Sequence, residues 1–255
     1  MHGIAENLYT LQQDLEVARK IQGRLLPPPP KVPGYDLEVY YQPAGEVGGD
    51  FYDFLPMDGG RMGLLVADAS GKGLAGALLM VEARAMIRAM SSMTSSAAEI
   101  LTAVNRVLLR DLEKGRFVTA FLALLDPAKG KLTMANAGHT PMLLCREVGK
   151  TILQVQPKGS ILGVVSDAKF SAAMVEETID LYPGDRFLLY TDGVSELMNP
   201  VSEEFGMERL ETWMRVNSHL WSEDAVRTLT DALELHRAGQ MQSDDITILT
   251  ARLEP

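Results

Sequence analysis

Residues 61–73 read Arg-Met-Gly-Leu-Leu-Val-Ala-Asp-Ala-Ser-Gly-Lys-Gly. The run from Met62 to Ala67 holds only apolar residues and one glycine, which predicts a strand buried on both faces. The strand reaches Asp68 just before a glycine-containing turn, so this carboxylate is expected where the chain leaves a sheet. The stretch therefore predicts a buried sheet with a charged group at one end.

Working outward, strand patterns lie on both sides of this stretch, and each run of strands is followed by two helices. The predicted strands cover 36–42, 50–56, 61–69, 117–125, 131–136, 142–146, 170–180, 186–191 and 246–253. The predicted helices cover 76–93, 96–112, 206–216 and 222–236. Such grouping predicts an α+β fold with mainly antiparallel sheets.

The N-terminal segment shows a seven-residue apolar pattern. Its positions are Ile4, Leu8, Leu11, Leu15, Ala18 and Leu25, with Gln22 as the polar member. This spacing predicts a helix able to pair in a coiled coil, and the prolines at 27–30 end it. We expect residues 1–26 to be a helical linker or dimerisation segment, with a homodimer through residues 4–25, and residues 27–255 to be one domain. The alternative is a helix packed on its own domain.

Composition excludes several classes of protein. The net charge of −10 argues against a nucleic-acid-binding protein, because phosphate backbones require clustered lysine and arginine. Cys145 is the only cysteine, so no internal disulfide and no cysteine-based zinc site is expected. No run is long and apolar enough to span a membrane, and we expect a cytoplasmic protein.

Aspartates recur beside glycines or at strand ends in four segments, at 48–53, 67–73, 190–193 and 243–247. Each alone is most often a turn. Together they could bring several carboxylates to one edge of the sheets, where mutual repulsion favours a bound cation. Because the donors are oxygens, Mg²⁺ or Mn²⁺ is expected in place of zinc.

In order along the chain, these segments resemble the motifs of the PPM (protein phosphatase 2C) superfamily of metal-dependent phosphatases, in its bacterial SpoIIE/RsbU-like branch. Residues 45–53, 67–73, 135–141 and 181–196 carry the resemblance, which covers nearly the whole chain. It implies an αββα sandwich, two mainly antiparallel sheets flanked by helix pairs, with an N-terminal helical extension. It also implies two Mn²⁺ or Mg²⁺ ions at the edge where the sheets meet.

Carried over by position, the resemblance implies that Asp68 is the catalytic residue that bridges both ions. Asp50 and the Ala69 carbonyl would complete the protein ligands of one ion. Asp192 and Asp244 would hold the other.

Two positions remain open in this assignment. Asp245 is a further candidate metal ligand, but Asp244 is preferred because it takes the place of the aspartate in the superfamily's Asp-Asn pair. The phosphate-binding arginine of other relatives has no counterpart near Asp50, which leaves Lys72 as a weak candidate for binding phosphate. Ser70 stands where those relatives have a histidine, so the general acid is unassigned.

The implied function is a metal-dependent protein serine/threonine phosphatase, in which a water bridging the two ions attacks the phosphomonoester directly. The implied substrate is a phosphoprotein, with a STAS-domain anti-sigma-factor antagonist of a bacterial partner-switching pathway as the candidate. One alternative is a catalytically silent signalling module with the phosphatase fold. Another is an enzyme that acts on small-molecule phosphate esters.

Overall fold

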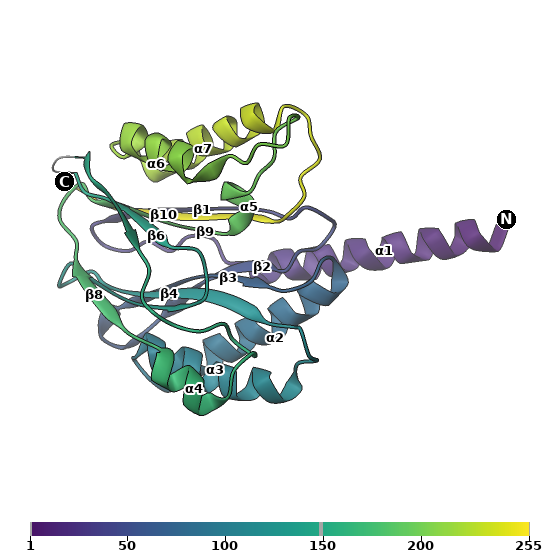
Figure 1. Ribbon diagram of the computed structural model, residues 1–255, viewed down its shortest axis with the longest axis horizontal. Helices are drawn as coiled ribbons and strands as arrows, with labels where there is room; N and C mark the ends of the chain where they lie inside the picture. Colours follow the sequence, from purple (N-terminus) through teal and green to yellow (C-terminus); the bar gives the residue numbers. More distant parts are fainter. Residues whose placement is uncertain (1, 148–149, 255) are drawn as a thin grey trace.

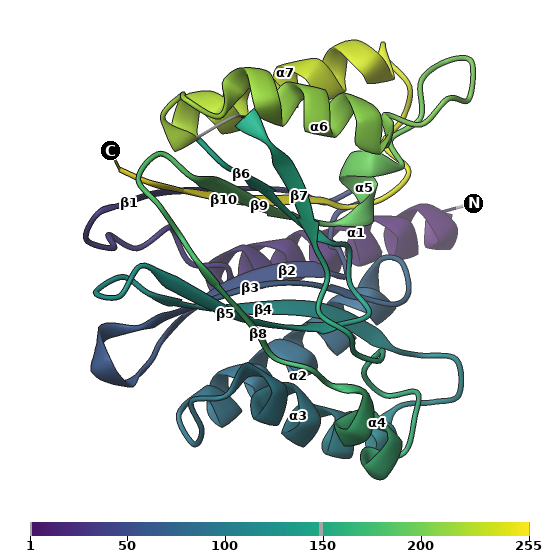
Figure 2. The same cartoon turned by 60° about the vertical axis from the view of Figure 1, so that its left-hand side comes forward.

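Two antiparallel sheets pack face to face, and helices cover both outer faces. The structure, a computed structural model, describes residues 2–147 and 150–254, with side chains from Tyr9 onward. Sheet A has the strand order β1-β10-β9-β6-β7, and sheet B has the order β2-β3-β4-β5-β8. Figures 1 and 2 show the four layers from two directions. The arrangement confirms the predicted αββα sandwich.

The strands and helices have the following bounds. Sheet A contains β1 (Tyr35–Gln42), β6 (Met142–Cys145), β7 (Ile152–Val155), β9 (Arg186–Tyr190) and β10 (Ile246–Leu253). Sheet B contains β2 (Asp50–Pro56), β3 (Met62–Ala69), β4 (Val118–Asp126), β5 (Lys131–Ala137) and β8 (Glu177–Asp180). The helices are α1 (His2–Leu25), α2 (Leu74–Ser91), α3 (Ala97–Asp111), α4 (Asp167–Ala173), α5 (Asp192–Ser195), α6 (Gly206–Asn217) and α7 (Ser222–Arg237). Among the described residues, no helix is both long enough and apolar enough to cross a bilayer.

Strand β3 is buried on both faces, as its unbroken apolar run predicts. Leu64 and Val66 pack between the two sheets. Leu65 and Ala67 point the other way, into the core formed with α2 and α3. Because side chains alternate along a strand, a strand covered on both sides must be apolar at successive positions.

Helix α3 begins at Ala97, next to the predicted start at residue 96. The Ser96 side chain accepts a hydrogen bond of 3.1 Å from the backbone N–H of Glu99, which caps the first turn. The helix then buries one face against sheet B through Ile100, Leu101, Val104 and Leu108. A local cap and an apolar face thus fix where α3 starts and how it lies.

The prediction of one strand over 170–180 is wrong in its first half. Residues Asp167–Ala173 form α4, and only Glu177–Asp180 pairs with β5. Phe170 is fully buried in the core that α3 shares with sheet B, so tertiary packing decides the local structure. The short strand β7 was not predicted; it pairs with β6.

Helix α1 ends at Leu25, as the prolines predict, and it projects from the domain (Figure 1). Its last turns contact the domain, because Gln22 is only 4% exposed. Leu11, farther from the domain, is 56% exposed. The polar member of the seven-residue pattern therefore faces the chain's own domain, as the alternative expectation held for this end of the helix.

Strand pairing brings the aspartate segments to one end of the sandwich. Asp50 at the start of β2 stands opposite Asp68 near the end of β3. In sheet A, β9 runs into Asp192 beside the start of β10, which directly follows Asp245. Because neighbouring strands are antiparallel, the start of one strand meets the end of the next. The two sheets thus deliver their aspartates to a shared edge.

A buried ion-pair cluster lies on β2, and its loss should destabilise the fold. Asp53 is fully buried; its carboxylate oxygens accept hydrogen bonds of 2.6 and 2.7 Å from Arg88, and Arg84 lies 3.1 Å away. Asp53→Asn leaves two guanidinium groups without their counter-charge, so we expect a loss of about 3 kcal/mol or more in urea unfolding. Asp126→Asn, which removes a turn carboxylate paired with the exposed Lys129, should cost about 1 kcal/mol or less. Equal losses would contradict a structural role for this cluster.

Candidate metal centre

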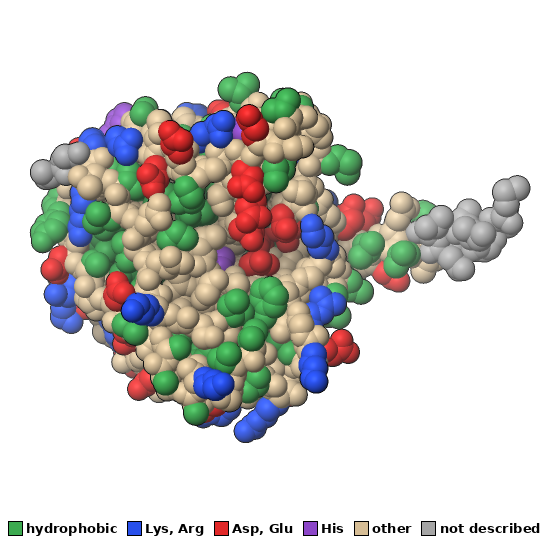
Figure 3. Space-filling view, viewed as in Figure 1, with side chains coloured by type: hydrophobic (Ala, Val, Ile, Leu, Met, Phe, Trp, Pro, Cys, Tyr) green, Lys and Arg blue, Asp and Glu red, His purple; other side chains and the backbone are tan. Residues whose placement is uncertain are grey.

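The candidate site is a pocket at the end of the sandwich where loops from both sheets meet. Its volume is about 320 Å³, and it is lined by Ala44, Gly45, Val47, residues 68–73 and residues 242–245. On this face, acidic side chains gather in a strip between the two helix layers (Figure 3). The pocket is therefore bordered by negative charge.

Asp50 joins the two sheets at the base of this site. It is 2% exposed, and its Oδ2 accepts hydrogen bonds from the hydroxyls of Thr191 at 2.6 Å and Thr247 at 2.8 Å. Burial, followed by the charge of Asp68, raises the pKa of Asp50 well above its usual value, while the two hydroxyls lower it. Both hydroxyls contact one carboxylate oxygen, so these contacts leave the other oxygen unused.

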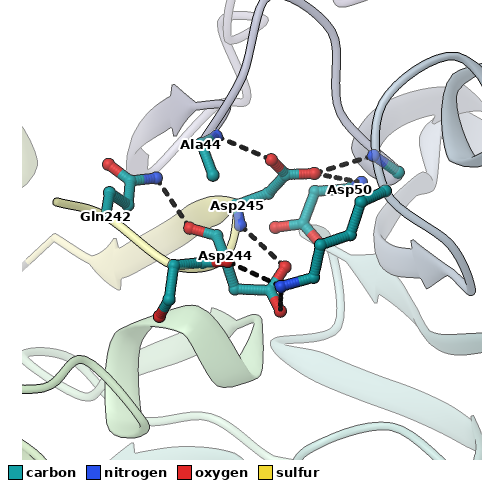
Figure 4. A network of polar contacts seen from close by, with 8 residues as sticks. Ala44, Asp50, Gln242, Asp244 and Asp245 are labelled. Carbon is teal, nitrogen blue, oxygen red and sulfur yellow. Dashed lines mark hydrogen bonds and ion pairs between the residues drawn. The ribbon is translucent and has the colours of Figure 1, made fainter.

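Asp245 is fixed by backbone amides of the loop that precedes β2. Its Oδ1 accepts from the N–H of Ala44 at 2.8 Å, and its Oδ2 accepts from Gly49 at 2.7 Å and Asp50 at 3.3 Å. Figure 4 shows its carboxylate turned toward this loop, while the Asp244 carboxylate turns to the other side. A Cβ on Gly48 would stand 2.3 Å from Asp245 Oδ2, so glycine is required there. Asp245 thus anchors the loop that carries Asp50.

Burial and the charges of neighbouring aspartates raise the pKa of Asp68 and of Asp192. Burial, and then the charges of Asp192, Asp244 and Asp245, raise the pKa of Asp68 to about 7. Burial and the charge of Asp244 likewise raise the pKa of Asp192. Each of these carboxylates is less stable as an anion because its neighbours are anions too. A cation would relieve this repulsion.

Backbone geometry adds a neutral oxygen donor. A Cβ on Gly49 would lie 2.3 Å from the carbonyl oxygen of Ala69, so only glycine leaves the space beside that oxygen open. A side chain on Gly193 would meet the carbonyl oxygen of Asp245 at 1.9 Å. The glycines of the predicted motifs therefore let the loops of neighbouring strands approach closely within each sheet.

The Lys72 side chain extends across the pocket and reaches the loop before β10. Its ammonium donates to the carbonyl oxygen of Ser243 at 2.8 Å and lies 3.7 Å from Asp244 Oδ2. Both side chains are largely exposed, so the attraction is screened by water. Lys72, the residue that the sequence suggested for binding phosphate, thus lies next to the candidate metal ligand Asp244.

The donor set fits hard divalent cations in its chemistry. Its available oxygens come from carboxylates and one carbonyl, the donors that Mg²⁺ and Mn²⁺ prefer. Within the described part of the chain, however, no three acidic, histidine or cysteine side chains already converge on one point. Asp68 and Asp244 line the pocket, Asp192 lies near enough for its charge to act on Asp68, and ion binding would have to draw the three closer together.

The structure therefore brings the predicted aspartates to one site but divides their roles. Asp50 and Asp245 are held by groups from distant segments, whereas Asp244 accepts its hydrogen bond from the N–H of the next residue at 2.9 Å. Sequence reasoning missed Thr191 and Thr247 as partners of Asp50, although each is within two residues of a predicted site aspartate. It also missed Gln22, whose side chain donates to the Gly48 carbonyl at 2.7 Å and accepts from the Gly48 N–H at 3.1 Å.

Comparison with known proteins gives consistent matches. The family described as "Stage II sporulation protein E (SpoIIE)" matches residues 58–254. The chain is 26% identical over 245 residues to "Phosphoserine phosphatase RsbU" of Bacillus subtilis, which covers 95% of this chain and 70% of that protein. It is also 26% identical over 264 residues to "Protein IcfG" of Synechocystis sp., which covers 92% of this chain but only 41% of that protein. This chain therefore spans less than half of the length of IcfG.

A solved structure matches the fold over almost the whole chain. The SiaA-PP2C domain of Pseudomonas aeruginosa superposes with a TM-score of 0.84 at 23% identity, covering 98% of this chain and 100% of that one. At this level of identity the likeness concerns the architecture. The likeness in fold also includes residues before 58, which the family match does not cover.

Asn substitutions should separate Asp244 from Asp245. Asp244→Asn removes a carboxylate that borders the pocket, so we expect weaker Mn²⁺ binding in calorimetry with an unchanged melting temperature. Asp245→Asn places an amide N–H₂ against backbone N–H groups, so we expect a loss of about 1–3 kcal/mol in unfolding free energy. A stable Asp245→Asn variant that fails only to bind metal would reverse the two roles.

Proposed function

The chain belongs to the stage II sporulation protein E (SpoIIE) family, and on this basis we propose that it is a metal-dependent protein serine/threonine phosphatase of the PPM type. The observation that carries the proposal is that Asp68 and Asp244 line one pocket, while burial and the charges of neighbouring aspartates raise the pKa of Asp68 to about 7 and also raise the pKa of Asp192. A site that holds only hard oxygen donors suits Mg²⁺ or Mn²⁺. Reactions at phosphorus are a common use of such ions.

In this proposal each site residue has a distinct task. Asp68, Asp50 and the Ala69 carbonyl would hold one ion, and Asp192 and Asp244 would hold a second, with Asp68 shared by both. Divalent ions in this position would supply positive charge that activates water and neutralises the phosphoryl oxygens during in-line displacement. Asp245 would act indirectly, by holding the 44–50 loop and so the position of Asp50.

The proposed substrate is a phosphoserine or phosphothreonine on a protein. Similarity to the Bacillus subtilis protein named phosphoserine phosphatase RsbU supports this class of substrate. A STAS-domain anti-sigma-factor antagonist in a partner-switching pathway is the candidate partner. A small-molecule phosphate ester is the alternative, and turnover of a phosphoprotein and of small esters under the same conditions separates the two.

Metal dependence and the variant Asp68→Asn test the proposed function. Wild type should hydrolyse an aryl phosphate and a phosphoprotein with Mn²⁺ or Mg²⁺ and lose this activity in excess chelator. Asp68→Asn should keep the fold but retain less than about a tenth of the rate, a loss of roughly 1.4 kcal/mol or more in transition-state stabilisation. The control Asp126→Asn should behave as wild type. A wild-type protein whose melting temperature rises with Mn²⁺ but which shows no turnover would favour the silent signalling module.

We also propose that residues 1–26 pair two chains and influence the site. The exposed Leu11 on the projecting part of α1 and the contact of Gln22 with Gly48 support this proposal, because the helix ends against the loop that leads to Asp50. Pairing that moved the helix would shift Gly48, and metal sites tolerate displacements of only about 0.5 Å.

Leu11→Asp tests the pairing. A charge at this position of the seven-residue pattern should prevent helix association, so sedimentation velocity should show monomers where wild type shows dimers. The Mn²⁺ concentration that gives half-maximal activity should change as well. Gln12→Asp, on the neighbouring exposed position, is the matched control. A monomeric wild type at high concentration would leave α1 without this role.

A further inference from the structure

Arg116, just before β4, lies against the loop that forms one wall of the pocket. Its Nη1 donates to the carbonyl oxygen of Ser70 at 3.2 Å. Next to it, the N–H of Phe117 donates to the Ser70 hydroxyl at 2.8 Å, and the Ser70 N–H donates to the Phe117 carbonyl at 2.9 Å. These contacts hold the backbone next to Arg116 against the loop that contains Ser70.

Gly71 allows the guanidinium to reach the pocket wall. Its φ of 113° lies in the region that favours glycine, and a Cβ there would stand only 2.1 Å from Arg116 Nη1. Ser70 and Gly71 both line the pocket that is bordered by Asp68 and Asp244. The guanidinium therefore packs directly on residues that form the site.

The charge of Arg116 is not neutralised by the protein. Within the described residues, no carboxylate lies within ion-pair distance of it, whereas Arg84, Arg88 and Arg106 each pair with an aspartate. Its one side-chain hydrogen bond goes to a neutral carbonyl. A guanidinium has five N–H donors, so most of its donors remain available to a ligand.

We propose that Arg116 binds the phosphoryl oxygens of the substrate phosphate monoester. The proposal rests on the phosphatase function proposed above and deepens it by naming the group that recognises the substrate dianion. A doubly negative phosphate that approaches the acidic pocket needs compensating positive charge from the protein as well as from metal ions. Arginine's planar fork suits two phosphoryl oxygens, which a lysine matches only as a point charge.

Lys72 lines the pocket and Arg116 packs behind its wall, but the charge of Arg116 is the one that no carboxylate of the described residues engages. The Lys72 ammonium already contacts the Ser243 carbonyl and lies beside Asp244, so binding phosphate would require it to leave both. Arg116 can accept a phosphate while keeping its bond to Ser70. It stands 46 residues from Ser70 in sequence, which is why motif inspection around Asp50 does not find it.

Substitutions at Arg116 test the proposal. Arg116→Gln removes the charge but keeps an amide that can donate to a carbonyl, and Arg116→Lys keeps the charge without the fork. We expect Arg116→Gln to raise KM for p-nitrophenyl phosphate and for a phosphothreonine peptide about tenfold or more, the loss typical of a charged hydrogen bond. The inhibition constant of orthophosphate should rise in parallel, and Arg116→Lys should lie between. Arg106→Gln on α3, which breaks the pair with Asp167 of α4, is the matched control.

Binding and stability measurements separate the competing outcomes. Calorimetry of orthophosphate with Mg²⁺ present should show weaker binding to Arg116→Gln, with melting temperature and Mg²⁺ affinity unchanged. Unchanged KM and phosphate binding would overturn the proposal, as would an effect on the peptide alone, since that outcome assigns Arg116 to residues flanking the phosphate. Equal losses of stability and Mg²⁺ affinity would make it a clamp for the 69–73 loop. A wild type without turnover would contradict the phosphatase function, and calorimetry would still decide whether Arg116 binds phosphate.

Discussion

The structure depends on the burial of two carboxylates where its sheets meet. Asp50 of sheet B accepts hydrogen bonds from the hydroxyls of Thr191, which follows β9, and Thr247 of β10, both belonging to sheet A. Asp245, just before β10 of sheet A, accepts hydrogen bonds from backbone amides of the 44–50 segment, which leads into β2 of sheet B. An ionised carboxylate loses several kcal/mol of hydration when it is buried without partners, so these contacts are a condition for closing the sandwich at this end. They also set how far apart the loops of the site stand.

The pocket above them carries electrostatic strain that the fold itself does not need. Asp68, Asp192 and Asp244 could be replaced by neutral side chains without loss of any hydrogen bond between the sheets described above. Burial, together with the charges of neighbouring aspartates, raises the pKa of Asp68 and of Asp192. Perturbed carboxylates gathered in a pocket are typical of functional sites, because only a bound cation or a chemical task makes the arrangement favourable. Asp245 thus serves the fold, Asp68, Asp192 and Asp244 are free of that task, and Asp50 has one oxygen in the contact between the sheets and one left for a ligand.

Local patterns made most of the fold predictable, and contacts distant in sequence limited the rest. The apolar run before Asp68 and the cap at Ser96 are local signals, and both predicted elements formed. Phe170 became helical because of the core it enters, which no neighbouring residue indicates. The division between Asp244 and Asp245 had a weak signal, since consecutive residues near a strand point to opposite sides. No pattern in the sequence indicated the contacts of Gln22 with the backbone of Gly48 or of Arg116 with the carbonyl of Ser70, because these partners are backbone groups far along the chain.

The loop that leads to Asp50 is held by side chains that come from elsewhere in the chain and bind its backbone. Gln22 of α1 holds Gly48, and Asp245 holds the amides that follow. A bond from a side chain to a loop backbone fixes the path of the chain without using the loop's own side chains, which stay free for ligands. Ligand positions in such a site have to be set within about 0.5 Å before binding. The fold therefore preorganises Asp50 through Gln22 and Asp245, and a change at either anchor reaches Asp50 through the backbone.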